Sequence, residues 1–196
     1  MISNSDTLEK TVKKIDDVPS ADRISSKLLD NSIFFLVGEI DEDNVTECIK
    51  WLTFENLDNK SKILTLYINS TGGSLYDAFA LIDIIQSSNH PVRTIAIGAA
   101  MSSAFLILAA GTKGERFIAR NASLMCHQFT ESMDSKYHDL KATMRENDLS
   151  NAKMVEILKE ATGLATSKIK AKLLPASDVY LTPQEALDLG IADQLL

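Results

Sequence analysis

The fold class is indicated first by residues 63–85, which read ILTLYINSTGGSLYDAFALIDII. The apolar run at 63–68 predicts a buried strand, and the polar, glycine-containing segment after it predicts a turn. Apolar residues then recur at helical spacing, at Leu75, Ala78, Ile82 and Ile85. A strand that leads through a tight turn into a helix is the repeating unit of an α/β fold.

The same alternation continues on both sides of this stretch. Further strands are expected at 33–37 and 92–97, with short apolar pieces at 117–118 and 124–126. Helices are expected at 43–54, at about 103–110 and, as one long polar helix, at about 133–161. A last helix begins at the capping box Thr182-Pro183-Gln184-Glu185 and ends at Gly190. Repeated strand–helix units predict crossover connections within one sheet.

Composition indicates one globular domain. The chain has 196 residues, of which 45% are hydrophobic and 24% charged, and its net charge is -7. These values exclude a wholly disordered chain, and the acidic excess argues against a nucleic-acid partner. We expect a polar N-terminal arm at 1–23 and a single domain at 24–196, with no internal repeat.

Cysteine content and hydropathy predict a reducing compartment and no membrane partner. Cys48 and Cys126 cannot form a disulfide framework, and the polar start has no apolar core of a secretory signal. We therefore expect a cytoplasmic protein, or one of an organelle stroma or matrix. Residues 94–112 are uncharged, but Gly98 and the pair Ser102–Ser103 interrupt them, so a buried strand, turn and helix are expected there instead of a membrane span.

No cofactor or metal is expected. The chain contains neither a GxxxxGK[ST] nor a GxGxxG motif, and it has no CxxC pair. Of its three histidines, His90 and His138 are interpreted as solvated surface residues. His127 differs, because it directly follows an apolar strand.

Three features could support nucleophilic catalysis, although each also has a simpler structural explanation. Ser102 follows a predicted strand and precedes a buried helix, where serine is commonly an ordinary helix cap. His127 could be a structural histidine of the core. The pair Gly72-Gly73 could be no more than a turn, or it could point free N–H groups at an oxyanion.

Together these segments resemble the Clp protease proteolytic subunit, a caseinolytic serine peptidase. The similarity lies in INSTGGS at 68–74, GAAMSSAFLILAAG at 98–111 and LMCHQ at 124–128, in the order and spacing of that family. It extends backwards through SSKLLDNSIFFLVGEI and forwards through TPQEALDLGIAD, and so covers about residues 24–196.

The resemblance implies a role for each matching residue. Ser102 would be the nucleophile, His127 the general base and Asp178, just before the terminal LTPQEA segment, the acid of the triad. Asp188 and Asp193 are rivals by residue type, and the interval before Asp178 has extra length within 164–177. The backbone N–H groups of Gly73 and Ser103 would form the oxyanion hole. Substrate would be bound by four further residues: Gly72, Ser74, Leu75 and Phe129.

The resemblance also implies an architecture and partners. The fold would be a crotonase-like repeated β-β-α superhelix with a protruding handle helix, and the chain would assemble into two stacked heptameric rings. Unfolded polypeptides would be cut to short peptides in this chamber, fed by an ATP-dependent AAA+ unfoldase of the Clp family. Ser87 and Thr65 stand where that family has aromatic docking residues, whereas Tyr67 is aromatic as expected.

Two other functions remain open at this point. One is a catalytically weak or inactive assembly subunit of a mixed ring. The other is a crotonase-fold acyl-CoA hydratase or isomerase, which also uses paired backbone N–H groups but relies on acidic residues at other positions. Cys126 is interpreted as a core residue and not as a nucleophile, because neighbours on a strand point to opposite faces.

Overall fold

The computed structural model describes residues 19–57, 62–130 and 136–196. The chain divides into two compact units, 1–33 and 34–196. In the first, the helix α2 (Ser20–Asp30) buries no residue. Most of the expected arm, residues 1–18, lies outside the described part, and the expected boundary between 23 and 24 falls within α2.

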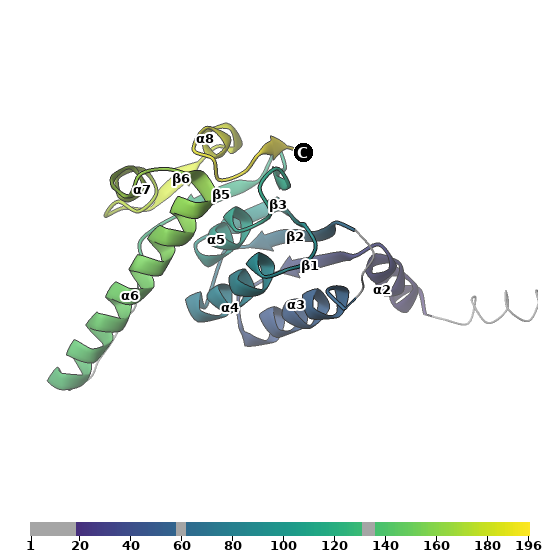
Figure 1. Ribbon diagram of the computed structural model, residues 1–196, viewed down its shortest axis with the longest axis horizontal. Coiled ribbons are helices and arrows are strands. Elements are labelled where there is room, and N and C mark those ends of the chain that lie inside the picture. The colour runs from purple at the N-terminus through teal and green to yellow at the C-terminus, as the bar shows by residue number, and fades with distance from the viewer. Residues whose placement is uncertain (1–18, 58–61, 131–135) are drawn as a thin grey trace, which may run out of the picture. The chain divides into compact units, whose positions relative to one another are not determined.

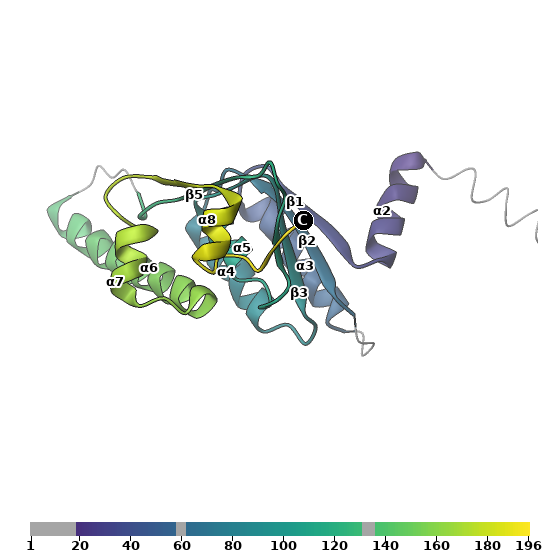
Figure 2. The ribbon, with the colours of Figure 1, turned by 90° about the horizontal axis from the view of Figure 1, so that it is seen from above.

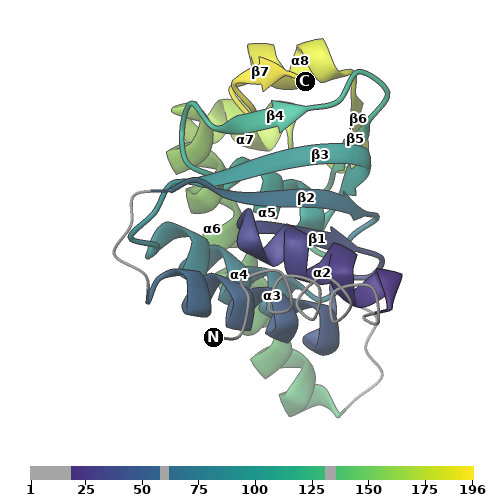
Figure 3. The same ribbon diagram turned by 90° about the vertical axis from the view of Figure 1, so that its right-hand side faces the viewer.

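The described strands form one sheet. Five of them follow the order β1-β2-β3-β4-β7, while β5 pairs with β3 and with β6 (Figure 3). Their bounds are β1 (Ile33–Val37), β2 (Leu64–Ser70), β3 (Val92–Met101), β4 (Arg116–Ile118), β5 (Ser123–Cys126), β6 (Val179–Leu181) and β7 (Gln194–Leu195). The three strands predicted from the sequence are present as β1, β2 and β3, of which β3 is longer than expected, and the two short apolar pieces form β4 and β5. The strands β6 and β7 were not foreseen.

The sheet branches at β3. The first half of this strand pairs in parallel with β4, through Thr94–Ala96, and its second half pairs in parallel with β5, through Ala99–Met101. On its other side β3 runs parallel to β2. Because parallel strands end at the same edge, the segments that follow β2, β3 and β5 emerge together.

Three helices lie on one side of the first strands (Figure 2). They are α3 (Glu42–Glu55), α4 (Leu75–Gln86) and α5 (Ser103–Ala109), each within two residues of its predicted bounds. The side chain of Asp41 caps α3, and that of Ser74 caps α4. All seven residues of α5 are buried, so it packs in the core on every side and needs no polar face.

The long helix α6 (Tyr137–Thr162) contacts α5 and α7. Its three buried residues, Ser150, Met154 and Leu158, all lie in its C-terminal half, and its N-terminal turns extend away from the sheet in Figure 1. Two large apolar side chains of its N-terminal half, Tyr137 and Met144, are exposed in the isolated chain. Residues 133–135 of the predicted helix lie outside the described part.

Residues 164–177 contain a helix that the sequence analysis missed. This helix, α7 (Thr166–Lys172), buries only Ile169 and has no side-chain cap, so neither periodicity nor punctuation marks it. The final helix α8 (Pro183–Asp188) begins with the predicted capping box of Thr182 and Glu185.

The predicted α/β class is confirmed as a mixed α/β fold with a mostly parallel sheet. None of the helices in the described part is long and apolar enough to span a membrane. The interpretation of His90 as a solvated residue is wrong, because it is only 8% exposed. Its turn folds onto itself through Ser88, whose hydroxyl donates to the His90 carbonyl at 2.9 Å.

Candidate active site

The site forms where three parallel strands end. Ser102 directly follows β3 and His127 directly follows β5, and these strands pair with Met101 opposite Met125. The glycine turn follows β2, whose last residue, Ser70, pairs with β3. Residues far apart in the chain therefore meet at one edge of the sheet.

Ser102 occupies a strained backbone conformation. Its φ is 53° and its ψ is -123°, in a region that non-glycine residues rarely adopt. Two hydrogen bonds hold it there: its N–H donates to the Met125 carbonyl at 2.9 Å, and its carbonyl accepts from the Phe105 N–H at 3.1 Å. Such strain costs about 1–3 kcal/mol and persists where the surroundings fix it, as the buried helix α5 does here.

The Ser102 hydroxyl meets the His127 imidazole. Ser102 Oγ lies 2.7 Å from His127 Nε2, within hydrogen-bonding distance. Both residues are half-buried, so they remain reachable by a substrate. A serine hydroxyl is a weak nucleophile until a hydrogen-bonded base removes its proton, and this geometry supplies such a base.

The glycine turn packs directly against this serine. A Cβ on Gly72 would lie 2.7 Å from Ser102 Cβ and 2.8 Å from the Met101 carbonyl oxygen, so only glycine fits. A Cβ on Gly73 would collide with the Ile40 carbonyl oxygen, and φ is positive at both glycines. Because these two glycines have no side chains, the turn can place its backbone N–H groups close to the nucleophile.

Two N–H groups beside Ser102 are available to a ligand. Neither the Gly73 N–H nor the Ser103 N–H donates a hydrogen bond to another described residue. The two residues are linked at 3.3 Å through the Ser103 hydroxyl and the Gly73 carbonyl. Paired N–H groups next to a nucleophile can stabilise the negative charge of a tetrahedral intermediate.

Asp178 is close to this pair along the sheet but forms no hydrogen bond or ion pair with it. The antiparallel ladder of β5 and β6 ends with Cys126 opposite Val179, so the next positions, His127 and Asp178, face each other beyond its end. Asp178 is exposed, and no hydrogen bond joins these two described residues. The predicted third member therefore stands beside the histidine without orienting it.

A small pocket opens beside the nucleophile. Its volume is about 80 Å³, and it is lined by Gly73, Leu75, Ser102, Ser103, His127, Gln128, Phe129, Thr130 and Met154. Leu75 and Phe129, two of the residues expected to bind substrate, thus line it. The other two do not: Gly72 lies under Ser102, and Ser74 caps α4 by accepting from the Asp77 N–H.

Cys126 is unsuited to act as the nucleophile. It is 1% exposed, and burial raises the pKa of its thiol to about 12, although a backbone hydrogen bond at His127 opposes this shift. A thiol with so high a pKa is protonated near neutral pH, and the thiolate is the reactive form.

The described residues also contain no group of three or more His, Cys, Asp or Glu placed to hold a metal ion.

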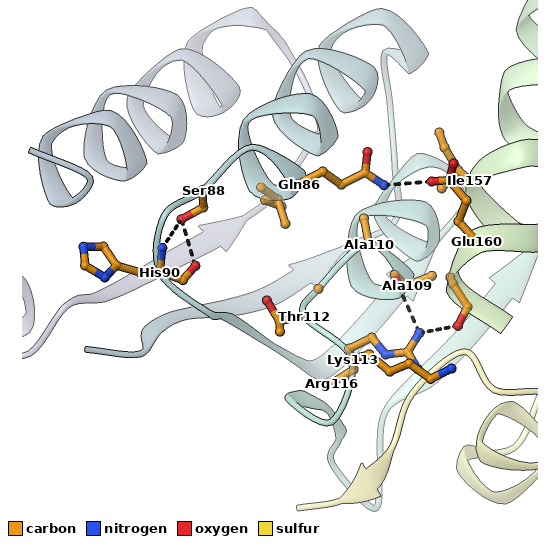
Figure 4. Close-up of a pocket in the computed structure, with 13 residues that line it drawn as sticks. Gln86, Ser88, His90, Ala109, Ala110, Thr112, Lys113, Arg116, Ile157 and Glu160 are labelled. Atoms are coloured by element: carbon orange, nitrogen blue, oxygen red, sulfur yellow. Dashed lines mark hydrogen bonds between the residues drawn. The ribbon is translucent and has the colours of Figure 1, made fainter. Parts of the chain in front are cut away.

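A second serine and histidine share another pocket but are not arranged for catalysis. This pocket, of about 260 Å³, lies among the ends of α4, α5 and α6 (Figure 4). Ser88 Oγ donates to the His90 carbonyl or to Asn56 Oδ1 and accepts from the His90 N–H at 3.2 Å, so its bonds to His90 go to the backbone. The imidazole in Figure 4 points away from Ser88, so the base is not presented to the hydroxyl.

Beside this second pocket lies an ion pair between a buried arginine and a half-buried aspartate. Arg116, which is 2% exposed, donates to both carboxylate oxygens of Asp193, at 2.7 and 2.9 Å. Its guanidinium also donates to the carbonyls of Ala109 and Ala161, which end α5 and α6 (Figure 4). Burial alone would raise the pKa of Asp193, but hydrogen bonds from Arg116, its charge and the Gly114 N–H hold that pKa below the usual value.

The chain also matches the model of a known protein family. A family model described as Clp protease matches residues 16–196. The chain belongs to the Clp protease family. Members of this family are peptidases, are generally oligomeric and work with Clp unfoldases.

Sequence reasoning missed some pocket residues of this Clp protease. Met154 comes from α6, far along the chain, and only its burial at helical spacing with Leu158 marks it. Gln128 stands within the LMCHQ segment, and its side chain donates to the Leu174 carbonyl at 2.9 Å. This bond ties the segment after His127 to the turn before Asp178, a link that no sequence pattern reveals.

Proposed function

We propose that this chain is a serine endopeptidase that cuts unfolded polypeptides into short peptides. The observation that carries the proposal is the 2.7 Å approach of Ser102 Oγ to His127 Nε2 at the strained turn after β3. The free N–H groups of Gly73 and Ser103 lie beside it. An acyl-CoA hydratase or isomerase would leave this serine–histidine contact without a purpose.

Acylation of the serine is the first chemical step. Ser102 Oγ attacks the peptide carbonyl carbon as His127 Nε2 takes the hydroxyl proton. The N–H groups of Gly73 and Ser103 stabilise the oxyanion, and each such donor typically lowers the activation barrier by about 3 kcal/mol. The C–N bond then breaks as His127 returns the proton to the leaving amine.

Deacylation repeats the same roles with water. His127 removes a proton from a water molecule, whose oxygen attacks the ester carbonyl. The second tetrahedral intermediate collapses, the Ser102 ester bond breaks and the proton returns to Ser102 Oγ. In both half-reactions Asp178 would hold the imidazole tautomer and stabilise the imidazolium, which requires its carboxylate to turn towards His127.

We infer a crotonase-like superhelix whose helix α6 serves as a handle between two stacked heptameric rings that enclose the sites. Large apolar side chains stay exposed along this helix, at Tyr137, Met144 and Leu149, as expected for a surface that a second subunit covers. The outer face of β1 and β2 exposes a stacked pair, Phe35 and Tyr67, suited to an unfoldase docking loop.

The working compartment is part of the proposal. Cys48 and Cys126 are both buried free thiols, and burial raises the pKa of each. Proteins with reduced cysteines are typical of reducing compartments. We therefore propose the cytoplasm, or an organelle stroma or matrix, as the place of action.

The open position of Asp178 favours one second candidate. A chain whose acid does not orient its histidine could be a catalytically weak or inactive assembly subunit of a mixed Clp ring. Hydrolysis of a model peptide by the purified homo-oligomer would separate the two functions, because an assembly subunit would show none.

A fluorophosphonate probe tests the proposal directly. The assembled protein should be labelled at Ser102 alone, and Ser102→Ala should abolish both labelling and peptide hydrolysis. Ser123→Ala, at an exposed serine of β5 outside the site, is the matched control and should retain both. An unlabelled Ser102 in assembled protein would refute the peptidase proposal.

A further inference from the structure

A side chain joins the segment that carries His127 to the segment that carries Asp178. Gln128 Nε2 donates to the Leu174 carbonyl oxygen at 2.9 Å, although the two residues are 46 positions apart in the chain. Gln128 directly follows the candidate base, and Leu174 precedes the candidate acid within the same turn. The bond therefore connects the two segments that must approach each other if Asp178 is to orient His127.

Leu174 is a fixed point of the fold. Its N–H and that of Leu173 both donate to the Ile169 carbonyl at the end of α7, at 3.0 and 2.8 Å. All three residues belong to the buried core, and none of them is more than 4% exposed. Because a close-packed core yields little, the carbonyl that accepts from Gln128 is held in place.

His127 and Asp178 lie between two cross-links. On one side, the β5–β6 ladder ends one residue before His127 and one residue after Asp178. On the other side, Gln128 bonds Leu174, and only residues 175–178 lie between this bond and β6. The two cross-links limit how far the two backbones can separate, which leaves the Asp178 side chain to turn towards the imidazole.

Gln128 makes this bond without being part of the core. The residue is exposed, so its removal leaves no cavity. The next residue is held independently, because the Phe129 N–H donates to Asn151 Oδ1 on α6 at 3.4 Å. Loss of the glutamine bond would therefore loosen the turn before Asp178 while the segment after β5 stays attached to the fold.

We propose that Gln128 is a positioning residue: through its bond to Leu174 it holds the turn before Asp178 where the carboxylate can engage His127. This inference rests on the proposed peptidase function. Gln128 acts through Asp178 and not on the substrate, so it supports kcat by keeping the imidazole oriented.

The test removes the amide donor from the full-length assembled protein. Gln128→Met keeps the length of the side chain but cannot donate to Leu174. For a model peptide, kcat should fall about three- to tenfold, the range that one neutral hydrogen bond supports, and KM should not change. Gln128→Leu is a second variant of the same kind, and urea unfolding of both should match the wild type.

Gln194 provides the matched control. Its side-chain amide also donates to a backbone carbonyl, that of Gly114 at 3.4 Å, but it lies on β7, outside the candidate site. Gln194→Met should therefore leave both kcat and KM unchanged.

A double-mutant cycle shows whether the effect passes through the aspartate. In a chain that already carries Asp178→Asn, adding Gln128→Met should lower kcat by less than twofold, because the carboxylate that Gln128 positions is gone. A merely structural role would multiply the two losses. The rate at which a fluorophosphonate labels Ser102 gives the same cycle where turnover is slow.

The outcomes separate this inference from the proposed function. Multiplied losses, an unchanged kcat in both Gln128 variants, or a change confined to KM would overturn the positioning role, while labelling of Ser102 in the wild type would keep the peptidase. A loss of less than tenfold in Asp178→Asn would also overturn it, since little effect of the aspartate would be left to share. Wild-type protein with neither hydrolysis nor labelling would lose the proposed function, and this inference with it.

Discussion

Two aspartates near the C-terminus show opposite environments. Asp193 is held by the Arg116 side chain and by the N–H groups of Gly114 and Arg116, at 2.7–3.1 Å. Asp178 lies opposite His127 at the end of the β5–β6 ladder, yet it is exposed and forms no hydrogen bond or ion pair with the imidazole. The single chain thus supplies hydrogen-bond partners for Asp193, the structural carboxylate. It does not join Asp178, the carboxylate of the candidate active site, to His127.

The difference follows from burial. Arg116 is buried at the ends of two helices, and a buried charge without a partner costs several kcal/mol, about 3–5 when one member of a pair is removed. Folding therefore requires Asp193 to be in place. Asp178 is solvated, so folding imposes no such requirement and the carboxylate remains free to turn when the site is occupied.

The largest expected effect is on catalysis, from Asp178→Asn. If Asp178 orients His127 during turnover, kcat for a model peptide should fall about 10⁴-fold, because the amide selects the wrong imidazole tautomer. The midpoint of urea unfolding should not change, since the side chain is exposed. Asp188→Asn, at an exposed carboxylate on α8, is the control and should change neither quantity. A loss of less than tenfold would mean that Ser102 and His127 act without this carboxylate.

The next effect is on stability, from Asp193→Asn. Arg116 would lose its ionic partner while staying buried, which should lower the free energy of unfolding by about 3 kcal/mol. Urea unfolding measures it, and kcat per folded molecule should be preserved. Glu47→Gln removes an ion pair with Lys50 that is exposed on both sides, and it should have no measurable effect. Equal stability of the Asp193 variant and the wild type would show that the buried pair is dispensable.

The smallest effect is the pH dependence of the same pair. The pKa of Asp193 is lower in the folded chain than its ordinary value of 3.8, so the unfolded state binds the proton more tightly. The stabilisation is present above the ordinary value and is lost as pH falls towards the lowered folded pKa. Urea unfolding between pH 7 and pH 3 should show the gap between wild type and Asp193→Asn narrowing at the acid end. A gap that widens there would contradict the assigned direction.

Much of the fold could be predicted from local pattern. Short sequence patterns were enough to predict three features: the strand–turn–helix unit at 63–85, the apolar helix after Ser102 and the capping box at Thr182. Each is found as expected. The helix α7 and the strands β6 and β7 escaped notice, because they are short and bury little of their own surface. Their positions depend on contacts made by the rest of the chain.

The candidate site, like the fold, was predicted from the sequence only in part. Sequence named Ser102 and His127 and the glycine turn, since residue type and position after a strand are local properties. It could not show the positive φ of Ser102, the wall that Met154 contributes to the pocket or the bond from Gln128 to Leu174. These depend on segments that are distant along the chain.

The order of residues by itself determined the α/β class, the likeness to Clp proteases and the chemical groups available at each strand end. Only the tertiary structure decided that the Ser102 hydroxyl and the His127 imidazole lie 2.7 Å apart, that Asp178 is exposed and that the half-buried Asp193 pairs with the buried Arg116. The physical reason is that periodicity and propensity act over a few residues. Distances between side chains are fixed by sheet register and by core packing, which join segments from the whole chain.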